Sequence, residues 1–478
     1  MITVTRSLIR QYRSVVRRAL VERPAGVINH RVGFRSGSDG LRIQAVSSQV
    51  ALEYHLPGAF DTEELCVPAE FLADAEGRSP DVITLESQRS GKVLVSWTDR
   101  GIPQMIQYEL PRDHNTSGTI PPLPEVFKPN PPELLAALQD AVTITPRERI
   151  RYALDCLQLG GPAGKIVATD GRQVLVQVGF QFPWSGDVLV PALPIFGCRE
   201  LPHDEPVGVG IVEDWVALRI GPWTIWLHVD REGRFPKVED LFHQPTAAAS
   251  RVSIEAMDAE VLANALPRLP SDETMDQPIT LDLNGRVVVR ARPAGQTRST
   301  ELILSRSTLL GEALAISTNR QFLARALKLG FREVCFFGST APAQCNDGRR
   351  QYLWALLDPK DVIRPSDDSI QIESLTQVTS KKVIPTQPAR RRFKLIHSTT
   401  PSTSSPSGRE VRQTGPSKPD GEPQNASSIA QALALRAVVR EVLAHTSELI
   451  RVLKREKRQS RLVASTLASL KQLQKVAG

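Results

Sequence analysis

One order of helices and strands recurs three times over residues 1–359, and this repeat constrains the fold more than any single motif. Each copy is expected to contain a helix, several short strands, a second helix and then further strands. In the first copy, helices are expected at 5–20 and from the CVPAEFL sequence at 66–72. Its strands are expected at 30–35, 41–46, 50–55, 82–86, 92–97 and 104–110.

The second and third copies follow the same order. The second opens with a helix at 132–140, with Pro132 in the first turn, and later contains LVPALPI at 189–195, where Pro194 is expected to shorten any helix. The third has a helix at 257–266, an Asn284-Gly285 hairpin turn and a second helix within 316–327. The sequence therefore predicts an α+β protein with three repeated domains at 1–120, 121–250 and 251–360.

Composition agrees with a multi-domain globular protein. The chain has 478 residues, of which 41% are hydrophobic and 23% charged, and its net charge of +7 permits an anionic partner. The first residues lack a signal-peptide pattern and no apolar run approaches ~18 residues, so we expect a cytoplasmic protein without a membrane span. The five scattered cysteines show no metal-ligand spacing, which predicts reduced core thiols, no metal and no cofactor.

The last quarter of the chain has a different composition. Residues 361–427 are rich in Ser, Thr and Pro with basic clusters, which predicts a disordered linker. From 428 to 478 an imperfect heptad, with Val442, Leu449, Val463 and Leu470 on one seam, predicts a C-terminal helix and a possible coiled coil.

Two segments of the second copy carry a resemblance to a known family. KIVATDGRQVLVQ at 165–177 places an Asp-Gly turn between two apolar runs, and EGRFPKVEDLF follows at 232–242. Both are similar to segments in the middle domain of the bacterial DNA sliding clamp, the β subunit of DNA polymerase III. Asn319, Phe322, Leu323 and Leu327 resemble a further clamp motif in the third domain. The resemblance implies a ring dimer that encircles double-stranded DNA and tethers a DNA polymerase, with clamp-loader-like proteins as partners.

The first helix carries a basic face at helical spacing. Arg6, Arg10, Arg13 and Arg17 recur every three or four residues, and Arg320, Arg325 and Lys328 offer a second basic face in the third copy. Since clamp helices line the hole of the ring, the resemblance assigns these residues to DNA phosphates. A solvated basic surface is the alternative. The first helices of the second and third copies lack such a face.

The resemblance also implies a hydrophobic pocket for partner peptides between the second and third domains. The candidate pocket residues are Thr169, Gly171, Arg172, Gln173, Val174, Leu241, Leu353 and Ala355. Gln173 stands where the family has an arginine, so the pocket should differ in shape. Ordinary core packing is the alternative for Val174, Leu241 and Leu353.

No catalytic motif supports an enzyme. The chain lacks GxxxxGKS/T, GxSxG, HExxH and a glycine-rich dinucleotide turn, and Asp170 is explained by its turn. Two functions remain: a clamp that confers processivity on a polymerase, or a divergent clamp-fold scaffold for protein interactions that does not encircle DNA.

Overall fold

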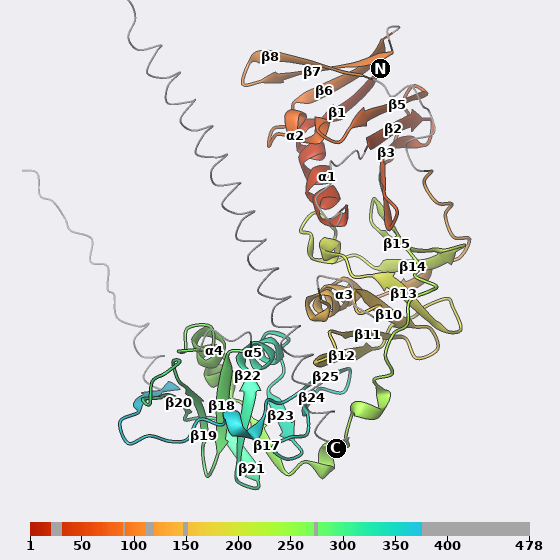
Figure 1. Cartoon of the computed structure of the whole chain (residues 1–478). Coiled ribbons are helices and arrows are strands. Elements are labelled where there is room, and N and C mark those ends of the chain that lie inside the picture. Colours follow the sequence, from red (N-terminus) through yellow and green to blue (C-terminus); the bar gives the residue numbers. More distant parts are fainter. Residues whose placement is uncertain (21–30, 89–90, 110–118, 147–151, 272–275, 375–478) are drawn as a thin grey trace, which may run out of the picture. The chain divides into compact units, whose positions relative to one another are not determined.

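The computed structural model describes residues 1–20, 31–88, 91–109, 119–146, 152–271 and 276–374 (Figure 1). The predicted coiled-coil helix at 428–478 and the larger part of the predicted linker, residues 375–427, lie outside these residues. Within them, the same succession of elements occurs three times. The α+β class with three repeated units is confirmed. No helix of the described residues is both long enough and apolar enough to cross a membrane.

The first unit has two helices and two sets of four strands. Helix α1 begins after Thr5, whose side-chain oxygen accepts a hydrogen bond from the Leu8 amide at 3.2 Å. The elements are β1 (Ile2–Thr5), α1 (Arg6–Ala19), β2 (Arg31–Gly37), β3 (Gly40–Val46), β4 (Val50–Leu56), β5 (Glu63–Pro68), α2 (Phe71–Ala75), β6 (Val82–Gln88), β7 (Lys92–Asp99) and β8 (Ile102–Glu109).

The second unit repeats this order with a shorter second helix. Pro194 begins only a single 3₁₀ turn, as the sequence predicted, because proline removes a helical amide donor. The elements are β9 (Lys128–Asn130), α3 (Glu133–Ile144), β10 (Cys156–Gly160), β11 (Lys165–Thr169), β12 (Gln173–Val178), β13 (Asp187–Pro191), η1 (Pro194–Gly197), β14 (Val207–Val212), β15 (Trp215–Ile220) and β16 (Trp223–His228). Short 3₁₀ turns η2 (Glu239–Leu241) and η3 (Pro245–Ala247) lead to the third unit.

The third unit adds two strands to the pattern, β21 and β26. Its elements are β17 (Ser250–Ser253), α4 (Ala256–Ala265), β18 (Pro278–Leu283), β19 (Val287–Ala291), β20 (Thr300–Leu304), β21 (Thr308–Gly311), β22 (Leu314–Asn319), α5 (Arg320–Lys328), β23 (Glu333–Phe336), β24 (Ala343–Asn346), β25 (Arg350–Trp354), η4 (Pro359–Asp361) and β26 (Ile370–Glu373).

The sheets join neighbouring units. An eight-stranded sheet runs β5-β2-β3-β4-β16-β15-β14-β9, and a nine-stranded sheet runs β13-β10-β11-β12-β25-β24-β23-β17-β21. In both, the third strand of one unit's first set pairs antiparallel with the last strand of the pattern repeated in the next unit, β4 with β16 and β12 with β25. The four-stranded sheet β1-β6-β7-β8 and the five-stranded sheet β22-β18-β19-β20-β26 contain the remaining strands.

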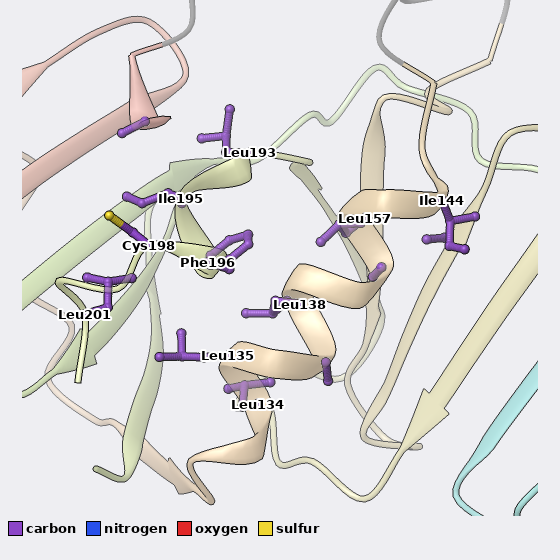
Figure 2. Close-up of a cluster of buried hydrophobic side chains, with 14 of the residues drawn as sticks. Leu134, Leu135, Leu138, Ile144, Leu157, Leu193, Ile195, Phe196, Cys198 and Leu201 are labelled. Atoms are coloured by element: carbon purple, nitrogen blue, oxygen red, sulfur yellow. The ribbon is translucent and has the colours of Figure 1, made fainter. Parts of the chain in front are cut away.

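The core of the second unit lies where α3 packs on η1 (Figure 2). Leu134, Leu135 and Leu138 of α3 point toward Ile195 and Phe196, and all five side chains are fully or almost fully buried. This contact fixes α3 by its apolar side.

Two sequence expectations need correction. Residues 66–68 of the expected second helix belong to strand β5, and α2 begins only at Phe71, because Val67 lies in register with Val32 in the sheet. The composition predicts a disordered linker from residue 361, but the structure describes residues up to 374, including η4 and β26. Alternation of Ile370 and Ile372 allows β26 to pair with β20 instead.

Candidate nucleic-acid interface and partner pocket

Arg6 does not belong to an exposed basic face. Its guanidinium is buried, pairs with Asp99 at 2.7 Å and donates to the carbonyl oxygens of Ala75 and Glu76 at 3.3 and 3.0 Å. The hydrogen bond from Arg6 lowers the pKa of Asp99. The prediction of a DNA contact at Arg6 is therefore at odds with its position, since this side chain fastens α1 to α2 and to the end of β7.

The remaining basic residues of α1 lie nearer the surface. Arg10 and Arg17 are exposed, whereas Arg13 is half-buried and pairs with Glu76 at 2.5 Å. Arg18, which the four-arginine pattern omitted, is exposed and donates to the carbonyl oxygen of Gly197 at 2.6 Å. The exposed basic surface of α1 thus consists of Arg10, Arg17 and Arg18.

The basic residues of α5 fall into three different settings. Arg320 is buried and donates to the carbonyls of Leu266, Leu269 and Pro270, which satisfies acceptors in the chain that follows α4. Arg325 is half-buried and donates a hydrogen bond to Gln173 of the second unit, whereas Lys328 is exposed. Arg320 is therefore a structural residue, and the predicted basic face of α5 reduces to Lys328 with part of Arg325.

Helices α3 and α4 present few charges. Glu133 and Glu260 are exposed acids on them, as the sequence indicated. Burial raises the pKa of Asp140 on α3, while Arg350 and Lys328 act in the opposite direction. Positive charge on the described helices is thus concentrated on α1 and at the end of α5.

The Asp-Gly turn between β11 and β12 is held by its own side chains. The Asp170 carboxylate accepts from the Arg172 and Gln173 amides at 2.8 and 3.0 Å. The Thr169 hydroxyl donates to the Gln173 carbonyl at 2.7 Å and accepts from the Gly171 amide at 3.0 Å. Gly171 has a φ of +86°, a conformation that costs glycine little. The structure explains Thr169 and Gly171 as turn residues.

Gln173 connects the second and third units. Its side-chain oxygen accepts from Arg325 at 2.6 Å and from the Tyr352 hydroxyl at 2.7 Å, while its amide nitrogen donates to Asp170 at 2.7 Å. The side chain is only 2% exposed. Gln173 therefore points into a buried polar network and not into an open pocket. Burial is also the main reason that the pKa of Tyr352 is raised.

Most predicted pocket residues meet along the β12–β25 pair. Val174 lies opposite Leu353 in the register, and the Ala355 amide donates to the Arg172 carbonyl at 2.8 Å. Arg172 itself is exposed, pairs with Asp276 at 2.7 Å and lies 5.6 Å from the ring centre of Phe322. The sheet thus brings together the predicted pocket residues of β12 and β25.

A small hydrophobic cluster lies over this strand pair, separate from the main core. Its buried members are Val167, Val174, Val238 and Leu353, with Val176, Phe235 and Phe242 packed against them. Leu241 is 43% exposed and is not part of this cluster. The sequence analysis did not predict Val238, Phe235 and Phe242 as pocket residues, although they lie with Leu241 in the segment 232–242.

Comparison with known proteins gives one consistent result. No protein-family model and no curated protein sequence matches the chain. Among solved structures, the DNA polymerase III β subunit of Pseudomonas aeruginosa is 20% identical with a TM-score of 0.60, over 74% of this chain and 99% of that chain. The sliding clamp of Bacillus subtilis is 15% identical with a TM-score of 0.62, over 74% and 98%. The β subunit of Streptococcus pyogenes is 16% identical with a TM-score of 0.62, over 74% and 99%.

These similarities define the fold. The described residues have the fold of the bacterial DNA sliding clamps, the β subunits of DNA polymerase III. Because those chains are matched almost to their full length, about a quarter of this chain has no counterpart in them.

Proposed function

We propose that this protein is a sliding-clamp-like tether that encircles duplex DNA as a head-to-tail ring dimer and holds replication or repair proteins on it. The observation that carries the proposal is the pairing of strands between units. β4 pairs with β16 and β12 pairs with β25, each antiparallel over five residue pairs. By the same order of elements, β8 and β20 are the corresponding strands that, within the described part of the chain, pair with no strand of another unit. β20 pairs instead with β26 of its own unit. Pairing of β20 with β8 of a second copy, and the reverse, closes a ring.

The exposed arginines of α1 support a duplex as the ligand. Arg10, Arg17 and Arg18 offer phosphate contacts, which are independent of sequence and sensitive to salt. Such contacts suit a ring that moves along DNA. Tethering requires no chemical step, and we therefore assign no catalytic role. Its place of action is the cytoplasm, on chromosomal DNA, where we expect a DNA polymerase and a clamp-loader-like protein as partners.

Retention on circular DNA tests the proposal. The purified full-length protein is assembled on nicked plasmid with a clamp loader and passed over a sizing column at moderate salt. We expect protein to co-elute with the circle and to be lost once a restriction enzyme linearises it. Equal loss from circular and linear DNA would contradict encirclement.

Charge reversal tests the DNA surface separately. Arg10→Glu with Arg17→Glu should weaken duplex binding and reduce the slope of log affinity against log salt by about 2. The matched control is Arg35→Glu with Arg349→Glu, two exposed arginines that lie outside the helices. If both pairs of substitutions weaken binding equally, only net charge matters.

A second function is favoured by one specific observation. The exposed sides of α3 and α4 carry Glu133 and Glu260 and lack a basic stripe. A divergent clamp-fold scaffold that binds proteins without encircling DNA would have this distribution. The circular-DNA experiment separates the two functions, because a scaffold is not released by linearisation.

The cluster on β12 and β25 is the proposed partner site. Its apolar side chains, including Phe235 and Phe242, suit a short hydrophobic peptide of a polymerase or repair protein. Gln173 is already bonded on both polar atoms, so we propose that recognition at this site is mainly apolar.

A further inference from the structure

The edge of β20 that ring closure needs is covered by the chain itself. In the two composite sheets, the strands equivalent to β20 pair with the last strand of the pattern repeated in the next unit, as β4 does with β16 and β12 with β25. The order β22-β18-β19-β20 is the same as β5-β2-β3-β4, but its next strand is β26, which comes later in the same chain. β26 pairs parallel with β20, from Thr300 opposite Ile370 to Ile303 opposite Glu373.

Several contacts hold β26 in place. The Ile370 amide donates to the Ser299 carbonyl at 2.9 Å, and the Gln371 side chain donates to Glu301 at 3.2 Å. The Ser374 side chain is fully buried and accepts from the Ser305 amide at 3.1 Å. Upstream, the buried Arg290 donates to the Ile363 carbonyl at 3.1 Å. The segment is therefore fastened before and after the strand.

The covering strand is nevertheless small. β26 has four residues, and Ile370 is 45% exposed. Its competitor is longer: β8 has eight residues and, among the residues the structure describes, pairs only with β7. Ile102 and Met105 of β8 are 63% and 69% exposed, whereas the equivalent strand β16 is buried at all but one position. A strand edge with exposed apolar side chains is a surface suited to another strand.

We infer that β26 is an internal cap that competes with β8 of a second copy for the edge of β20, so that ring closure requires release of residues 370–373. The inference rests on the proposed ring. Both strands need the same outward amides and carbonyls of β20, and one edge pairs with one strand at a time. The attached strand has a high effective concentration, and the second copy offers more residue pairs.

Its consequence is quantitative. If β26 covers the edge about nine-tenths of the time, apparent affinity falls about tenfold at each of the two interfaces, and about a hundredfold for the closed ring, because both β20 edges must be uncapped. Any partner that removes the segment from β20 would then promote ring closure.

The test compares proline substitutions in the full-length chain. The Ile370 amide faces β20, and the Ile372 amide, two residues further along the strand, faces it too. Ile372→Pro removes that second amide. Glu373→Pro is the matched control, since alternation turns the Glu373 amide away from β20 and its side chain is exposed. Dimer dissociation constants are measured by analytical ultracentrifugation, and hydrogen exchange of β20 in dilute monomer checks that the cap is released while the domains stay folded.

We expect Ile372→Pro to dimerise about tenfold or more tightly than wild type, and Glu373→Pro to match wild type. Equal dimer constants for all three, with faster exchange of β20 in Ile372→Pro, would overturn the cap and leave the ring intact. Failure of every form to dimerise at any concentration would overturn the ring and the cap together.

Discussion

Gln173 makes a polar contact between the second and third units. In the clamp motif this position holds an arginine, whereas here the guanidinium near it comes from Arg325 on α5. The neutral amide accepts two hydrogen bonds and donates one, which a second arginine could not do. The Gln173 side chain therefore links β12 to α5 through Arg325 and to β25 through Tyr352.

The Gln173 network predicts a stability effect. Gln173→Ala should lower the free energy of unfolding by about 1–3 kcal/mol, because the buried Tyr352 hydroxyl loses its 2.7 Å acceptor and keeps only the Phe322 carbonyl at 3.5 Å. Gln107→Ala, which removes an exposed side-chain hydrogen bond to Gln88, is the control and should change it by less than about 0.5 kcal/mol. Urea titration followed by tryptophan fluorescence measures both. Equal effects would mean that the network contributes little.

Arg6 separates folding from DNA binding. Arg6→Ala should lower the free energy of unfolding by about 1.5–3 kcal/mol, because a charged donor to two carbonyls is lost. The pKa of Asp99 is lower in the folded than in the unfolded protein, first because of the hydrogen bond from Arg6. The stabilisation of the fold by this pair is therefore present above the unfolded-state pKa of Asp99 and is lost as pH falls through its folded-state pKa. Acid titration of stability should therefore be flatter in Arg6→Ala. A variant as stable as wild type but defective on DNA would contradict this assignment.

At the scale of elements, the composite sheets explain why the apolar cluster has the residues it has. β12 is a middle strand once β25 pairs with it, so Val174 and Leu353 become buried, at 3% and 4% exposed. The segment after Phe235 then packs over them through Val238 and Phe242. Leu241 remains at the margin, where a ligand can reach it.

This difference predicts two kinds of pocket variant. Val174→Asp should destabilise the fold, because a carboxylate is buried without a partner. Leu241→Asp should leave the unfolding midpoint unchanged. It should weaken the binding of a short synthetic peptide, with the sequence of a bacterial replicative polymerase tail, by about tenfold or more. Calorimetric titration measures affinity, and exposed Leu310→Asp is the control. Unchanged peptide affinity in Leu241→Asp would exclude Leu241 from the site.

The sequence predicted elements better than it predicted the surroundings of side chains. The repeat, the Asp170-Gly171 turn and the short turn at Pro194 follow from local preferences, and the structure has them. Helical spacing alone could not separate Arg6 from Arg10, because burial of Arg6 depends on Asp99, which is distant in sequence. Likewise, the composition after residue 361 did not predict strand β26, because this strand forms through pairing with β20, which is distant in sequence.

At the scale of the whole molecule, β8 and β20 are the two ends of one repeated pattern. Each interface within the chain joins such a pair of strands, and the edge of β8 has no neighbour among the described residues. Exposed Met105 on β8 is therefore expected to contact a second copy when β26 is released. Val82 on β6 is similarly exposed, at 55%, but its strand already lies between β1 and β7.

This placement gives the last prediction. In the Ile372→Pro chain, Met105→Lys should weaken dimerisation about tenfold or more, because an ammonium must lose water against the partner's sheet. Val82→Lys adds the same charge and should leave the dimer constant unchanged. Ultracentrifugation of both double variants decides the matter, with circular dichroism to establish equal folding. If Met105→Lys dimerises as tightly as Val82→Lys, β8 is not the strand that meets β20 of the second copy.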